Sequence, residues 1–263
     1  MSELLEQVCL AVRKVGREQV MPRYLKVAHE RKTDGSLLTE ADVATQHALI
    51  AELTRIAPYP VLGEEMTDEE QRRLWAEGQD GLWCVDPIDG TTNFVTGLPF
   101  FAISVALIKQ GRPQLGVIYD PRGDELFYAE VGGGAYLDGD PLPIKPPPAE
   151  LKRCIAGVDF KRLSKDLAVR LAGTHPYSSQ RNLGASTLDW CYLAAGRLHI
   201  YLHGGQKLWD YAAGSLILAE AGGVASTFGE DDFWQGDLWK RSVIAGLTPE
   251  LLADWRAWIR QSA

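Results

Sequence analysis

The chain has 263 residues, 46% of them hydrophobic, and its 35 acidic against 27 basic side chains give a formal net charge of −8. This composition is that of a globular protein with a sizeable core and excludes a disordered chain. Because no lysine- and arginine-rich run is present, we expect no polymeric nucleic-acid partner.

The first residues, MSELLEQVCLAVRKVGREQV, combine early acids with apolar residues at helical intervals. This pattern predicts an amphipathic helix that ends near Gly16 or Pro22, and it differs from the basic-then-apolar order of a signal peptide. No apolar run reaches membrane-spanning length, so we expect a soluble, cytoplasmic protein with no membrane partner. The irregular spacing of the cysteines favours reduced core thiols over zinc or a redox pair. These cysteines are Cys9, Cys84, Cys154 and Cys191.

A second helix is predicted over residues 39–56. Thr39 suits its N-cap, and Glu40 and Asp42 suit the positive end of its dipole. The KTDGS segment before it, residues 32–36, is predicted to be a loop.

The next elements carry acidic residues at their ends. YPVLGEE predicts a short strand that runs into Glu64, and MTDEEQRRLWAEG predicts an exposed, charged helix. In WCVDPIDGTTNF, residues 83–94, a buried strand ends at Asp86 and Asp89.

Residues 100–144 contain strand-like runs separated by short Gly- and Pro-rich turns, which leave no room for crossover helices. An antiparallel meander is therefore predicted. The prolines of KPPPAE mark a boundary between an N-terminal half, residues 1–145, and a C-terminal half, residues 146–263, within one compact unit. Beyond it CIAGVDF and LHIYLHGG predict strands, and SKDLAVRLAG, STLDWCYLAAG and LWDYAAGSLILAEAGG predict helices.

The acids at element ends have ordinary explanations as well as a chemical one. Asp210 suits a helix cap, paired glutamates at 64 and 65 suit a solvated loop, and DPIDGTT suits two turns. A carboxylate pair at a buried strand end without a basic neighbour must instead be protonated, exposed to solvent or bound to a cation. Carboxylate and carbonyl oxygens without His or Cys favour Mg²⁺ or Mn²⁺ over zinc.

Three segments resemble the signature motifs of the inositol monophosphatase family in order and spacing. They are GEE at 63–65, DPIDGTTNFVTGLPFFAISVAL at 86–107 and WDYAAGSLILAEAGG at 209–223. The KTDGSLLTEADVATQHAL segment is similar to the family's early region, and the resemblance weakens only after residue 225. It implies an α/β (α+β) fold, a layered α-β-α-β-α sandwich with antiparallel-rich sheets. It also implies a lithium-sensitive homodimer that hydrolyses small phosphate monoesters with Mg²⁺, for which Mn²⁺ can substitute.

The resemblance also assigns the metal ligands. Glu64, Asp86 and the carbonyl of Ile88 match the ligands of a first ion. Asp86, Asp89 and Asp210 match those of a second, with Asp86 bridging, and Glu64 would hold a third ion through water.

The same resemblance assigns the catalytic pair, and helix geometry adds a phosphate site. Thr91, assisted by Asp42, matches the pair that positions the attacking water. Gly90, Thr91 and Thr92 would begin a short helix whose backbone amides face the phosphate.

Substrate contacts are expected from the metal-site acids Asp89 and Asp210 and from a wall at residues 183–187, with Ala185 and Ser186 as candidates. The family commonly places a hydroxyl-binding glutamate seven residues before the second-motif aspartate. Here that position is His203, which we consider as a substrate contact against a structural or solvent-facing role. Lys207 is a candidate for a second phosphate, although surface solvation is the ordinary role of such a lysine.

The expected substrate is a small phosphorylated polyol, inositol 1-phosphate first, or a nucleotide. The alternatives are 3'(2'),5'-bisphosphate nucleotidase, histidinol-phosphatase and fructose-1,6-bisphosphatase, which share the metal core. A non-catalytic interaction protein on this scaffold is disfavoured, because every metal acid and Thr91 are retained.

Overall fold

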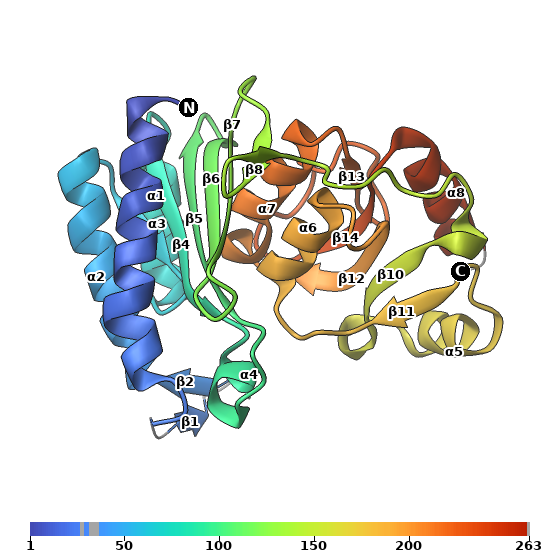
Figure 1. Ribbon diagram of the computed structural model, residues 1–263, viewed down its shortest axis with the longest axis horizontal. Helices are drawn as coiled ribbons and strands as arrows, with labels where there is room; N and C mark the ends of the chain where they lie inside the picture. The colour runs from blue at the N-terminus through green and yellow to red at the C-terminus, as the bar shows by residue number, and fades with distance from the viewer. Residues whose placement is uncertain (27–28, 32–36, 262–263) are drawn as a thin grey trace.

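The computed structural model describes residues 1–26, 29–31 and 37–261. Its elements stack in five layers, helix, sheet, helix, sheet and helix, from left to right in Figure 1. The expected layered sandwich is therefore confirmed, while the predicted KTDGS loop lies outside the described residues. The helices of the layers are α1 (Glu3–Val15), α2 (Glu40–Ile56), α3 (Asp68–Glu77), α5 (Lys165–Thr174), α6 (Ser186–Ala194), α7 (Leu208–Glu220) and α8 (Pro249–Arg260).

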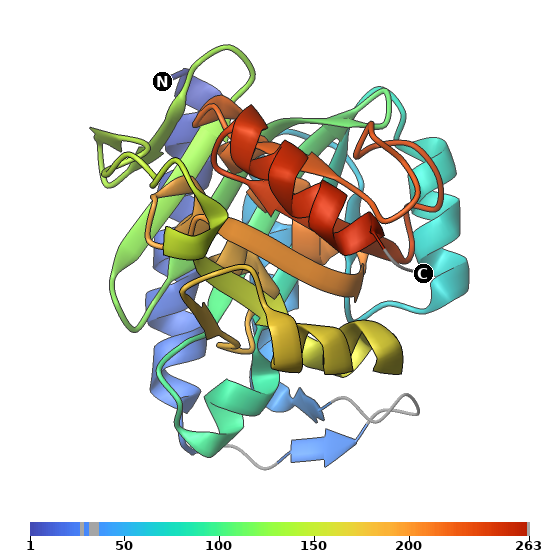
Figure 2. The same ribbon diagram turned by 90° about the vertical axis from the view of Figure 1, so that its right-hand side faces the viewer.

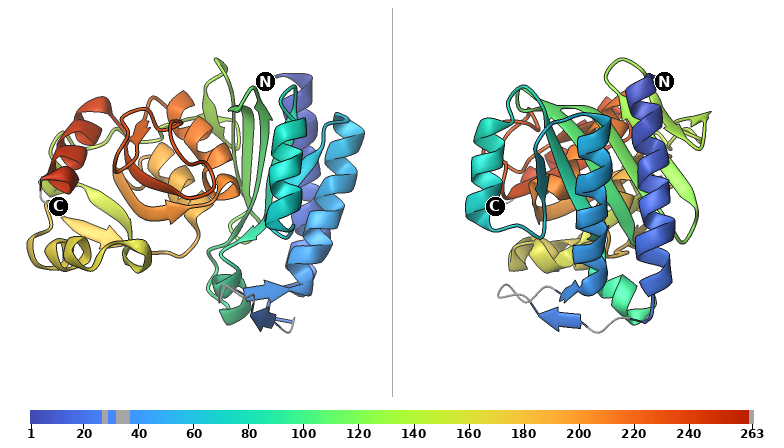
Figure 3. Two further views of the ribbon diagram at one scale, coloured as in Figure 1. Left: turned by 180° about the vertical axis from the view of Figure 1, so that it is seen from behind. Right: turned by 90° about the vertical axis from the view of Figure 1, so that its left-hand side faces the viewer.

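The first sheet has the order β3-β4-β5-β6-β7-β8-β9. Only β3 and β4 are parallel, and the remaining neighbours form the predicted antiparallel meander. Helices α1 and α2 cross its outer face, and α3 lies at the β3 edge (Figure 3). Its strands are β3 (Val61–Gly63), β4 (Leu82–Asp89), β5 (Ala102–Lys109), β6 (Arg112–Asp120), β7 (Glu125–Glu130), β8 (Ala135–Leu137) and β9 (Asp140–Pro141).

The second sheet has the order β11-β10-β12-β14-β13 and lies under α5 and α8, which face the viewer in Figure 2. The KPPPAE segment lies between the last strand of the first sheet and the first strand of the second. A separate two-stranded sheet consists of β1 (His29–Arg31) and β2 (Leu37–Thr39), which pair antiparallel. The strands of the second sheet are β10 (Ile155–Asp159), β11 (Ser179–Arg181), β12 (Ile200–Gln206), β13 (Val224–Ser226) and β14 (Arg241–Gly246).

Strand β4 is buried on both faces, and its side chains alternate between two cores. Leu82 and Cys84 pack with the middle helices, whereas Trp83 and Val85 pack with α1 and α2. This alternation sends the next even-numbered residue, Asp86, toward the middle layer.

Helix α7 lies between the two sheets and is apolar around almost its whole circumference, as expected for a buried helix. It packs tightly on α6, since a Cβ on Gly214 would lie 2.4 Å from the Cβ of Trp190. The cysteines are buried and unpaired, in agreement with the prediction of reduced core thiols. In the described parts of the chain, no helix combines the length and apolarity needed to cross a bilayer.

Candidate active site

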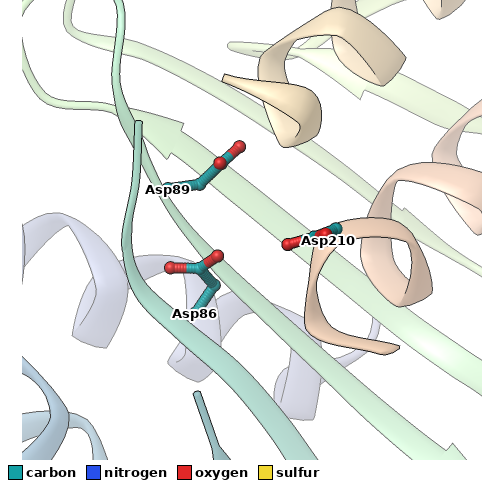
Figure 4. Close-up of side chains that lie close together, drawn as sticks. All are labelled: Asp86, Asp89 and Asp210. Atoms are coloured by element: carbon teal, nitrogen blue, oxygen red, sulfur yellow. The ribbon is translucent and has the colours of Figure 1, made fainter. Parts of the chain in front are cut away.

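The end of β4 directs two aspartates to the same side of the sheet. Asp86 pairs with Ser104 of β5, but the register then shifts, and Asp89 pairs with Ala102. In a regular strand, residues three apart point to opposite faces. The shift at residues 87–88 reorients the chain, as a bulge does, so that both carboxylates face the middle layer (Figure 4).

Asp210 approaches these residues from the first turn of α7. Its Oδ2 accepts the backbone N–H of Lys207 at 2.8 Å, so it also caps the helix. Asp86, Asp89 and Asp210 each offer a carboxylate oxygen, and these oxygens lie within 4.8 Å of one another (Figure 4).

The three carboxyl groups share an environment that opposes their ionisation. Burial and neighbouring carboxylates raise the pKa of Asp86 well above its usual value. Burial raises the pKa of Asp89 to about 6. Burial and the charge of Asp89 raise the pKa of Asp210 to about 8. Asp86 Oδ1 is buried and lacks a hydrogen-bond partner among the described residues. A divalent cation would satisfy this oxygen and reverse the local repulsion, so the donor set fits a metal ion.

The first turn of α6 holds the side chain of Asp89 in place. Asp89 Oδ2 accepts hydrogen bonds from the backbone N–H of Thr187 at 2.6 Å and from the Thr187 hydroxyl at 2.7 Å. The hydroxyl of Ser186 lies 3.4 Å from the same oxygen. Thr187 lies within the predicted wall at residues 183–187 but was not named as a site residue.

Glu64 follows β3 and lines the same cavity as the aspartates. Its backbone N–H donates to the carbonyl of Val85 at 3.2 Å, which extends the pairing of β3 with β4. The side-chain amide of Gln71 donates to the carbonyls of Gly63 and Glu64 at 2.9 and 3.3 Å. These bonds hold the strand end at the cavity.

Thr91 and Asp42, which the family resemblance pairs, lie close together. Thr91 Oγ1 lies 3.4 Å from Asp42 Oδ1 and 3.1 Å from the carbonyl oxygen of Ile88. Asp42 is fully buried, and its Oδ2 accepts the backbone N–H and hydroxyl of Thr39 at 2.7 and 2.6 Å. The capping box of α2 therefore orients the carboxylate toward Thr91.

A short helix, α4 (Thr91–Thr96), begins at the end of β4, as predicted. Gly90 immediately before it has a φ of 86°, which favours glycine. Asn93 donates from its side-chain amide to the carbonyls of Phe100 and Leu183, both at 2.7 Å. Asn93 therefore connects α4 to the segment that carries Ala185 and Ser186.

A cavity of about 440 Å³ lies at this site and is lined by the predicted metal ligands and Thr91. The other predicted lining residues Gly90, Thr92, Ala185, Ser186 and His203 also contribute to it. Gly184, which also lines the cavity, lies within the predicted wall at residues 183–187. The prediction omitted other lining residues, namely Asn93, Asp159, Lys161, Arg162, Asn182 and Asp189. Lys207 is exposed and lines a separate small pocket with Trp239.

His203 is 5% exposed, and both of its ring nitrogens have partners. Nδ1 accepts the backbone N–H of Gly205 at 3.1 Å, and Nε2 lies 3.0 Å from Asp159 Oδ2. The candidate substrate contact is thus engaged within the protein.

Known proteins with similar sequences belong to the family that the site residues resemble. The sequence model of the inositol monophosphatase family matches residues 1–262. An inositol-1-monophosphatase of Mesorhizobium japonicum is 36% identical over 220 residues, which cover 82% of this chain and 80% of that protein. The Nus factor SuhB of Pasteurella multocida is 36% identical over 206 residues, which cover 75% of this chain and 74% of that protein.

Solved structures show the same fold. The extragenic suppressor protein suhB of Bartonella henselae has a TM-score of 0.86 at 28% identity, with 100% of both chains covered. An inositol monophosphatase II of Staphylococcus aureus with bound inositol monophosphate has a TM-score of 0.78 at 27% identity, covering 98% of this chain and 94% of that one. The structure of the same protein with bound 2'AMP has a TM-score of 0.76 at 28% sequence identity and covers 96% of this chain and 90% of that one.

Proposed function

The chain belongs to the inositol monophosphatase family, and from this premise we propose that it hydrolyses small phosphate monoesters, inositol 1-phosphate foremost, with Mg²⁺ and water. The observation that carries the proposal is the meeting of Asp86, Asp89 and Asp210, whose carboxylate oxygens lie within 4.8 Å of one another. A phosphate dianion would be repelled by these acids alone, so their grouping supports a cation-dependent site.

The metal ligands are proposed from this chain's own oxygen donors. Glu64, Asp86 and the Ile88 carbonyl would hold one Mg²⁺. Asp86, Asp89 and Asp210 would hold a second, and Glu64 a third through water. Bound Mg²⁺, or Mn²⁺ in its place, would lower the pKa of a water and stabilise charge on the departing oxygen.

The protein groups would position the reactants. The Thr91 hydroxyl would form a hydrogen bond with the attacking water, as acceptor or as donor. Asp42, whose Oδ1 lies 3.4 Å from Thr91 Oγ1, would hold this hydroxyl in place. Gly90, Thr91 and Thr92 line the cavity, and their backbone amides would approach the phosphate oxygens. No covalent intermediate is required.

Inositol 1-phosphate is the first candidate because one relative is an inositol-1-monophosphatase and one neighbour binds inositol monophosphate. A panel that scores phosphate release from inositol 1-phosphate, histidinol phosphate, fructose 1,6-bisphosphate and adenosine 3',5'-bisphosphate tests this choice. The highest kcat/KM should belong to inositol 1-phosphate. A preference of more than about tenfold for the nucleotide, equal to 1.4 kcal/mol, would contradict it.

The nucleotide is the second candidate, supported by two cations on the cavity wall. Lys161 and Arg162 line the cavity and would meet a second anionic group. The 2'AMP bound by a neighbour points the same way. The relatives called Nus factor raise a non-catalytic role, but the retained metal acids and Thr91 favour catalysis. A homodimer remains part of the proposal from the family resemblance.

A further inference from the structure

Strands β10 and β12 are parallel neighbours in the second sheet (Figure 1), and Asp159 of β10 pairs in register with His203 of β12. Both residues line the cavity that contains the three aspartates. Because His203 Nδ1 accepts the backbone N–H of Gly205, the ring proton lies on Nε2. Nε2–H is then donated to Asp159 Oδ2, 3.0 Å away. Neither ring nitrogen retains a free hydrogen-bonding position for a substrate hydroxyl.

Asp159 has the capacity that His203 lacks. Its side chain is 20% exposed, compared with 7% for that of His203. Its Oδ1 accepts the backbone N–H of Lys161 at 2.7 Å, and its Oδ2 accepts the bond from His203. A carboxylate has about four acceptor positions, so acceptor capacity remains on each oxygen.

The carboxylate is also ionised at neutral pH. Burial alone would raise the pKa of Asp159, but interactions with its neighbours, among them the hydrogen bonds from His203 and the Lys161 amide and the charge of Arg162, lower the pKa below its usual value. An ionised acceptor forms stronger hydrogen bonds with hydroxyls than a neutral one does.

Local packing holds this carboxylate at the cavity. The turn Phe160–Arg162 follows Asp159 and lies against β12. A Cβ on Gly204 would lie 1.8 Å from the carbonyl oxygen of Arg162, so this approach requires glycine next to His203. The sequence of β12 therefore provides both the imidazole that contacts Asp159 and the space for the turn that follows it.

We propose that Asp159 accepts hydrogen bonds from the ring hydroxyls of a phosphorylated polyol and that His203 positions it. This inference rests on the proposed function and deepens it by naming the residue that recognises the alcohol. The acceptor positions on one carboxylate suit two neighbouring hydroxyls. The role that the family resemblance gives to a glutamate at position 203 thus passes to a carboxylate on the adjacent strand.

The test compares kcat/KM for inositol 1-phosphate with kcat/KM for p-nitrophenyl phosphate, an ester without neighbouring hydroxyls. Asp159→Ala should lower the ratio of the two values roughly 10- to 100-fold, as expected for lost hydrogen bonds to a charged acceptor. The loss should lie mainly in KM for inositol 1-phosphate. Asp159→Asn, which preserves size, should change the ratio in the same direction. Asp166→Asn removes an exposed charge on α5 and is the matched control.

Variants at His203 test the positioning role. His203→Ala should lower the ratio, and His203→Gln, whose amide can donate to Asp159, should restore part of it. In the double variant Asp159→Ala/His203→Ala, the second change should lower the ratio no further, because His203 acts through Asp159.

The outcomes separate the two proposals. An equal loss on both esters in Asp159→Ala and Asp159→Asn would overturn the hydroxyl role and leave the phosphatase proposal standing. Full activity of both variants on both esters, which also leaves the ratio of the two kcat/KM values unchanged, would likewise overturn the hydroxyl role. If the unmodified protein hydrolyses neither ester, the proposed function fails, and the role of Asp159 fails with it.

Discussion

The backbone amide and the hydroxyl of Thr187 both donate to one oxygen of Asp89, at 2.6 and 2.7 Å. The two bonds orient the carboxylate and counter the rise in its pKa that burial causes. Thr187→Val removes the hydroxyl and preserves the shape of the side chain. Loss of such a supporting bond should raise the Mg²⁺ concentration for half-maximal activity by roughly tenfold. Thr187→Ser is the control that should retain the original value, and equal Mg²⁺ dependence of all three proteins would contradict the prediction.

Asp86 is assigned to two ions, so Asp86→Asn should be the most damaging single substitution. Loss of several kcal/mol of charge stabilisation corresponds to roughly a 1,000-fold or greater fall in kcat. In the absence of metal, the same variant should unfold at a higher temperature than the unmodified protein, since it removes the cost of burying an ionisable carboxyl group beside other carboxylates. Phosphate release and thermal unfolding in EDTA measure the two effects. Near-normal turnover by the folded variant would refute the bridging role.

The raised pKa values of Asp89 and Asp210 predict how stability changes with pH. In the unfolded chain both groups lose their protons near the ordinary value of 3.8, but in the metal-free fold they retain them up to about 6 and about 8. The fold therefore binds more protons than the unfolded chain across this interval, and its free energy of unfolding should fall as pH rises. Mg²⁺ should offset the fall, because it binds the ionised carboxylates.

Thermal unfolding from about pH 5 to about pH 9, with EDTA or with Mg²⁺, measures this linkage. The stabilisation by Mg²⁺ should grow as pH rises through the interval. A stabilisation that shrinks with rising pH would show that these carboxylates do not hold the ion.

Helix α2, which begins with a capping box, places Asp42 beside Thr91, and this pair should act on kcat. Thr91→Ala should lower kcat by roughly 100-fold, the contribution of positioned proton-transfer chemistry, with little change in KM. Thr96→Ala removes an exposed hydroxyl from the same short helix and should retain activity. A change confined to the KM of Thr91→Ala would assign this residue to binding.

Lithium should inhibit phosphate release, as the family resemblance implies. The ion would compete with Mg²⁺ at the site that contains Asp210, so the inhibition should weaken as the Mg²⁺ concentration rises. Initial rates over a lithium series at fixed substrate measure this effect, and full activity at high millimolar lithium would contradict it.

Much of the fold was predictable because local sequence patterns determine many of its helices and strands. The apolar run from Leu82 to Val85 predicted β4, Thr39 and Asp42 predicted the start of α2, and the apolar run after Asp210 predicted the buried α7. Helix α8 was not predicted, although Thr248 caps it and its buried residues recur at helical spacing. The three-residue strands β11 and β13 carry too little pattern of their own and depend on pairing with neighbouring strands.

Some residues of the site were likewise predictable from local sequence motifs, whereas others depend on how the strands pair. The aspartates at positions 86, 89 and 210 were identified by motif, whereas the register shift that turns Asp89 arises from the pairing of β4 with β5. Asp159 lay outside the prediction because its importance depends on strand order, which places β10 beside β12 and the carboxylate against His203. Position alone suggested His203 as the substrate contact, but its two engaged nitrogens favour Asp159 as the acceptor.

The most direct test of the central claim is phosphate release from inositol 1-phosphate before chelation, after chelation and after Mg²⁺ is restored. The meeting of Asp86, Asp89 and Asp210 within 4.8 Å predicts no activity in excess EDTA and recovery with Mg²⁺. Asp86→Asn should show no recovery under the same conditions. An unchanged rate in excess EDTA would contradict a mechanism that depends on these carboxylates holding a metal ion.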